Sequence, residues 1–149
     1  MRMNRVILAL SALACVAACA APPVSPTAAP NPTPASPATA GALFGKACIL
    51  QLPGFAGTPA ALANAPVTQR AASGIYYHNA QNLSVRLLNS STGPACQVTY
   101  GTNVSRSEAV NTFFAAANAA APGARANVVQ DVVRGEDGLL YFTTTTRAQ

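Results

Sequence analysis

A proline-rich stretch at residues 20–41 places the strongest limit on where this chain can fold. Seven prolines fall within it, at positions 22, 23, 26, 30, 32, 34 and 37. Proline lacks an amide donor and fixes φ, and the alanines, serines and threonines between the prolines offer too little apolar surface for a core. We therefore expect a semi-extended tether, up to about 70 Å long as polyproline II at ~3.1 Å per residue. The remaining segment, 42–149, is long enough for one small globular domain.

An apolar run precedes this tether. It covers residues 6–18 and follows Arg2 and Arg5. The run is too short to span a bilayer core of about 30 Å, but it has the length of a signal-peptide core. It ends in Val16-Ala17-Ala18-Cys19, which resembles the bacterial lipoprotein signal. The resemblance implies that residues 1–18 are removed, that Cys19 is lipidated, and that the lipid anchors the protein to a cell-envelope membrane facing the periplasm or the exterior.

Two other processing schemes fit the same residues. Ala18-Cys19-Ala20 has the small-x-small pattern of ordinary signal peptidase, which would give a soluble secreted protein beginning at Ala21. Acylation of Cys15 is the second scheme, and it would leave Cys19, Cys48 and Cys96 in the mature chain. One of these would be an unpaired thiol in an oxidising compartment, whereas acylation of Cys19 leaves an even pair.

That even pair is Cys48 and Cys96, which we expect to form a disulfide. Closing the long loop between them would reduce the entropy of the unfolded chain by an amount worth about 4 kcal/mol. A metal site is the alternative for two cysteines, but the chain has no CxxC spacing and only one histidine. We expect neither a metal nor a cofactor.

Local patterns predict the elements of the domain. Ser105 and Glu108 form a capping box in front of an amphipathic helix that ends near Ala120. A shorter helix is predicted at 59–65, where a proline occupies the first turn. Alternating or β-rich segments predict five strands, at 74–78, 83–87, 96–100, 127–134 and 139–146, with turns at 79–81, 89–94 and 135–138. The fold class is α+β: a small single domain with a mostly antiparallel sheet of about five strands, two helices on one face and one disulfide.

Residues 47–102 contain a cysteine near LPGF, then GIYYHNAQNLSV, then ACQVTYGT. This pattern resembles small exported proteobacterial proteins whose activity is not assigned. The resemblance implies a disulfide-linked exported domain, and no catalytic or binding residue can be carried over from it.

Catalytic chemistry is poorly represented in the sequence. Of the four carboxylates, Glu108 is assigned to the helix cap and Glu136 and Asp137 to a turn, which leaves Asp131. A hydrolase would need His78 as its base, Asp131 to orient it, and Ser73, Ser84 or a tyrosine as nucleophile. The alternative interpretation of His78 is a structural residue that is hydrogen-bonded in a turn.

Binding is the preferred interpretation, with Tyr76, Tyr77 and His78 as candidate residues. Adjacent strand residues face opposite ways, so one tyrosine is expected in the core and the other at the surface. The chain carries a net charge of +5, but its arginines are scattered singly, which argues against nucleic-acid binding. We expect a lipoprotein with a tethered binding or accessory domain, whose partner is an envelope protein or peptidoglycan. The alternatives are a small histidine-dependent hydrolase and a periplasmic inhibitor of a hydrolase.

Overall fold

The computed structural model describes residues 32–148, so the predicted signal sequence, Cys19 and residues 20–31 of the predicted tether lie outside the described residues. The helices are α1 (Pro37–Ala47), α2 (Thr58–Leu62) and α3 (Arg106–Ala120), with a 3₁₀ turn, η1, at Ile49–Gln51. The strands are β1 (Val67–Arg70), β2 (Ile75–His78), β3 (Leu83–Ser90), β4 (Gly93–Thr102), β5 (Val128–Arg134) and β6 (Leu140–Arg147). Across 32–148, every helix is too short or too polar to cross a membrane.

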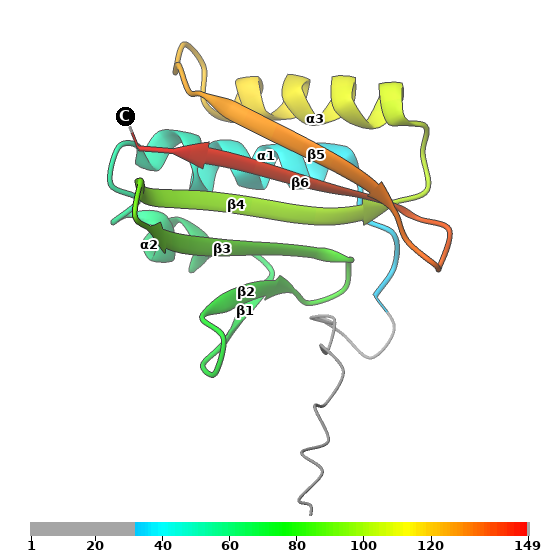
Figure 1. Ribbon diagram of the computed structural model, residues 1–149, viewed down its shortest axis with the longest axis horizontal. Coiled ribbons are helices and arrows are strands. Elements are labelled where there is room, and N and C mark those ends of the chain that lie inside the picture. Colours follow the sequence, from blue (N-terminus) through cyan, green and yellow to red (C-terminus); the bar gives the residue numbers. More distant parts are fainter. Residues whose placement is uncertain (1–31, 149) are drawn as a thin grey trace, which may run out of the picture.

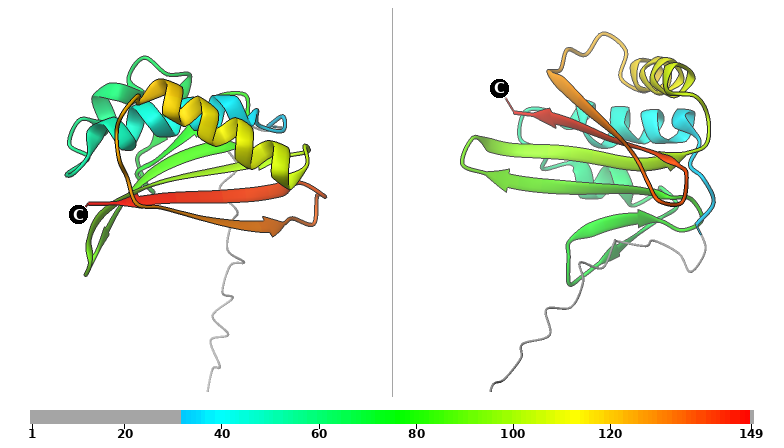
Figure 2. Two further views of the ribbon diagram at one scale, coloured as in Figure 1. Left: turned by 90° about the horizontal axis from the view of Figure 1, so that it is seen from above. Right: turned by 45° about the vertical axis from the view of Figure 1, so that its right-hand side comes forward.

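The strands form one antiparallel sheet in the order β1-β2-β3-β4-β6-β5. All helices lie against one face of this sheet, and the other face is left open (Figures 1 and 2). The predicted α+β class is confirmed. The structure adds a sixth strand, β1, and a third helix, α1, to the expected elements.

Strand register decides which residues enter the core. Tyr100 lies between Leu83 and Phe142, and all three side chains are buried under the helices. The residues adjacent to these along each strand point to the open face, as the paired Thr99 and Thr143 do. Aromatic rings link the two layers: Tyr100 stacks on Phe142 at 5.0 Å between centroids and on Phe113 of α3 at 5.4 Å.

Helices α1 and α3 pack side by side at unusually close range. A Cβ added to Gly41 would lie 2.1 Å from the carbonyl oxygen of Phe113, and one added to Gly45 would lie 2.7 Å from that of Ala117. Both contacts are shorter than any that a real side chain could make. The two glycines, four residues apart, therefore create the groove into which the α3 backbone fits.

The expected end of the tether at residue 41 is wrong, because α1 already begins at Pro37. Its proline occupies the first helical turn, where the missing amide has no helical partner to lose. Upstream of the helix, the Ala35 amide donates to Gly101 O at 2.6 Å, and Thr33 pairs with Gln81. Within 37–41, Ala40 is fully buried and Gly41 packs against the α3 backbone.

The predicted disulfide is confirmed. Cys48 and Cys96 are bonded, with 5.5 Å between their Cα atoms. Cys48 is the C-cap of α1 and Cys96 lies in β4, so the bond joins the first helix to a central strand. Both residues are fully buried.

Other local predictions hold with altered boundaries. The Ser105 hydroxyl accepts from the Glu108 amide at 3.3 Å, as the capping box predicts, and the final hairpin forms around Gly138, which has φ +82°. The turn expected at 89–94 shrinks to residues 91–92, because β3 and β4 continue to Ser90 and from Gly93. The helix predicted at 59–65 spans Thr58–Leu62.

Candidate functional site

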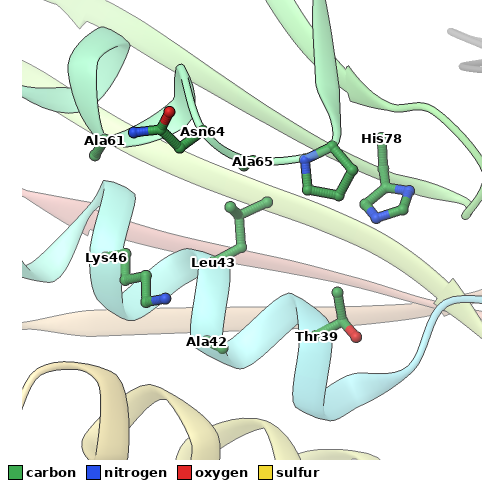
Figure 3. A pocket seen from close by; sticks show the side chains of 9 residues that line it. Thr39, Ala42, Leu43, Lys46, Ala61, Asn64, Ala65 and His78 are labelled. Atoms are coloured by element: carbon green, nitrogen blue, oxygen red, sulfur yellow. The ribbon is translucent and has the colours of Figure 1, made fainter.

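A pocket of about 380 Å³ opens on the helix side of the domain, between α1, α2 and the end of β2 (Figure 3). This volume lies within the range of small-molecule sites. Nine residues line it: Thr39, Ala42, Leu43, Lys46, Ala61, Asn64, Ala65, Pro66 and His78. The floor is mostly apolar, and a few polar groups reach into it.

One flank of α1 forms the longest wall. Thr39, Ala42, Leu43 and Lys46 follow the i, i+3, i+4, i+7 spacing that places side chains on one stripe of a helix. This stripe lies on the side of α1 away from Gly41 and Gly45, which contact α3. The first helix therefore packs tightly on one flank and borders a pocket on the other.

Helix α2 and the segment after it form the opposite wall. The Thr58 hydroxyl is buried and donates to Ala47 O at 2.6 Å, which fixes the start of α2 to the end of α1. Beyond this bond, Ala61 and Ala65 face α1 with only a methyl group each. These two methyl groups, and that of Ala42 on α1, leave the space between the two walls open.

His78 closes one end of the pocket and is only 7% exposed. Its Nδ1 accepts from the amides of Ala80 and Gln81, both at 3.1 Å. The neutral ring therefore carries its proton on Nε2. Burial lowers the pKa of His78 because desolvation disfavours the imidazolium. At neutral pH the residue is an uncharged hydrogen-bond donor.

The pocket has an uneven charge distribution. Lys46 is the one charged residue among the nine that line it, and no carboxylate is present there. Asn64, Thr39 and His78 supply the remaining polar side chains, all of which can donate hydrogen bonds.

The two tyrosines predicted to bind do not join His78 in this pocket. Tyr77 faces the open side of the sheet, opposite Ser84, but it is only 4% exposed, and the Arg70 guanidinium lies 4.8 Å from its ring centroid. Tyr76 points to the helix side and is half-buried against the core. Neither ring is the freely exposed tyrosine that the strand pattern predicts.

The residues of the hydrolase hypothesis are also kept apart. Asp131 lies in edge strand β5 on the open face, whereas His78 lies in β2 on the helix face. Ser84 shares the open face with Asp131 through the register Ser84, Thr99, Thr143. Ser73 lies in the turn before β2, where its hydroxyl accepts from the Ile75 amide. Between residues 32 and 148, no group of three or more histidine, cysteine or acidic side chains is arranged to hold a metal ion.

Sequence reasoning missed the α1 wall of the pocket, because residues 37–41 were assigned to the tether. The available signal was Pro37 followed by the stripe of Thr39, Ala42, Leu43 and Lys46. Comparison with known proteins adds nothing further: no protein-family model, curated protein or solved structure matches this chain.

Proposed function

We propose that this protein is a lipid-anchored envelope protein whose domain binds a small molecule in the pocket between α1, α2 and His78. The pocket carries the proposal, because it combines a ligand-sized volume, a mostly apolar lining and a few polar side chains that can donate hydrogen bonds. The lipoprotein signal at Cys19 and the proline-rich tether support the location.

The geometry around His78 favours binding over catalysis. A histidine that acts as a general base must accept a proton on a free nitrogen. Here Nδ1 is occupied by two backbone amides, and Nε2 already carries the proton. The pocket lining also lacks a carboxylate to stabilise an imidazolium. A neutral donor of this kind orients a ligand.

The anchor is tested by cell fractionation and mass spectrometry. The wild-type protein is expected in the membrane fraction with a diacylglyceryl group on Cys19, and Cys19→Ala should shift it to the soluble fraction. Cys15→Ala is the matched control, because it changes a neighbouring cysteine that the proposal places in the removed signal. Unmodified wild-type protein that begins at Ala21 would overturn the anchor and support secretion.

The binding site is tested by a fragment screen on the envelope-derived protein in lipid nanodiscs. The reporters are the alanine methyl signals of Ala42, Ala61 and Ala65, which line the pocket. Fragments should shift these methyls, and Ala61→Leu should remove the shifts by filling the space. Ala60→Leu adds the same side chain on an exposed position of α2 and should leave binding unchanged. A screen in which no fragment shifts the pocket methyls would contradict the proposed function.

A further inference from the structure

We infer that the pocket selects a small organic acid: an elongated molecule with a carboxylate at the Lys46 end, an apolar body, and room for a hydrogen-bond acceptor at the His78 end. This inference rests on the proposed function and names the chemical class of its ligand. It follows from how the polar groups are distributed along the pocket.

The polar groups sit at two ends of the pocket. Figure 3 shows Lys46 and Asn64 toward one end, and Thr39 and His78 toward the other. Leu43 and Ala65 lie between them. A ligand that fills this space therefore meets polar groups at its ends and hydrocarbon along its middle.

The distance between the ends follows from helix geometry. Thr39 and Lys46 are seven residues apart on α1, so their Cα atoms are separated by a rise of about 10 Å along the axis, and the Lys46 side chain reaches back into this distance. This rise is an upper limit for the ligand, and an extended chain of eight carbon atoms does not exceed it. Leu43 and the alanine methyls along this distance favour hydrocarbon over a polar chain.

The Lys46 end favours an anion. Figure 3 shows the Lys46 side chain directed along α1 toward Leu43. Its ammonium group can donate to a carboxylate, and no acidic residue of the pocket competes for it. Lys46 is partly in water, so its charge should give modest discrimination that falls with added salt.

The His78 end favours a neutral acceptor. Because Nδ1 is occupied, the side chain presents the Nε2 proton, and the Thr39 hydroxyl can donate from α1. A hydroxyl or carbonyl oxygen fits this end. The two ends are therefore chemically distinct and should bind an asymmetric ligand in one orientation.

The test uses octanoate, octanamide and octylammonium, which share one chain length and differ in charge. Each is titrated into the envelope-derived protein in nanodiscs while the pocket alanine methyls are followed. The Ala61→Leu protein in identical nanodiscs corrects for probe that partitions into lipid. The exposed Ala115 methyl of α3 reports non-specific effects.

Octanoate should bind most tightly, and Lys46→Gln should weaken octanoate about threefold to fivefold while leaving octanamide unchanged. Arg86→Gln is the charge-matched control, because Arg86 lies on the open face of the sheet, and it should have no effect. Adding a terminal hydroxyl, as in 8-hydroxyoctanoate, should tighten binding, and His78→Phe should remove that gain.

Two results would overturn this inference in different ways. Equal or tighter binding of octanamide or octylammonium at the pocket methyls would show that the ligand is not an acid, and the pocket would remain a binding site. If none of the four probes, including 8-hydroxyoctanoate, shifts the pocket methyls, the inference that the ligand is an organic acid is also overturned. In that case the fragment screen decides separately whether the pocket binds anything.

Discussion

Small residues on the two flanks of α1 have opposite structural effects. On one flank, Gly41 and Gly45 let α3 approach until no space for a Cβ remains. On the other flank, Ala42 faces Ala61 and Ala65 across a cavity of about 380 Å³. Small side chains therefore allow backbones to touch in one place and keep two walls apart in another.

The difference lies in what holds each partner. Helix α3 runs for fifteen residues beside α1 and contributes Phe113 to the core below. Helix α2 has five residues, and its start is fixed to α1 by the Thr58 hydroxyl and its end by the turn into β1. The long helix α3 can pack along the groove in α1. The short helix α2 is fixed at both ends and cannot move toward α1 to fill the space between them.

Removing the disulfide should have the largest effect, because it fixes the end of α1 from which both flanks are positioned. Replacing Cys48 and Cys96 together with alanine should lower the free energy of unfolding by about 4 kcal/mol. Chemical denaturation of the wild-type and double-variant proteins measures the difference. A variant with unchanged stability would show that packing alone positions α1.

Gly41→Ala should be nearly as damaging. The new methyl would lie 2.1 Å from the Phe113 carbonyl oxygen, so two helix backbones must separate. We expect a loss of about 3 kcal/mol, despite the higher helix propensity of alanine. Gly54→Ala is the control, because nothing lies within 4 Å of its added Cβ, and its stability should change little. A stable Gly41→Ala protein would remove the contrast between the flanks.

His78 should make stability depend on pH to a smaller extent. Its pKa is lowered by burial, so below about pH 6.5 the unfolded chain binds a proton that the folded state resists. Stability should therefore fall as the pH drops from 7.5 to 5.5, and His78→Gln should reduce this fall. Equal pH dependence in both proteins would show that His78 titrates as it does in water.

Ala42→Leu should have the smallest effect on stability, although it adds more atoms than Gly41→Ala at the adjacent position. The larger side chain enters the pocket, so we expect a change within about 1 kcal/mol. Binding of pocket ligands should be lost at the same time. Destabilisation comparable to that of Gly41→Ala would show that this flank is packed as tightly as the other.

The sequence predicted the parts of the fold that depend on local pattern. Ser105 and Glu108 begin α3, and Gly138 lies in the turn of the last hairpin. The even number of cysteines left after Cys19 predicted the bond between Cys48 and Cys96. Helix α1 was missed because its first residues, 37–41, were assigned to the proline-rich tether, and nothing local to Gly41 indicates the α3 backbone beside it. A residue that is unfavourable locally can be required by a neighbour far away in the chain.

The candidate site was less predictable for the same reason. His78 was identified as the sole histidine, but its partners in the pocket come from an undetected helix and from alanines that carry no chemical signal. The tyrosines were separated by strand alternation, as expected, but Arg70 covers the ring on the open face. A pocket formed by the absence of side chains leaves no motif in a sequence.

The bond between Cys48 and Cys96 also determines how the domain would respond to mechanical force. The chain enters the fold at Thr33 and Ala35, so tension on the segment before residue 32 would load the contacts of these residues first and α1 next. Peeling could proceed through α1 only as far as Cys48, where a covalent link transfers the load to β4 in the middle of the sheet. Beyond that point, further extension would require β4 to break its hydrogen bonds with β3 on one side and with β6 on the other.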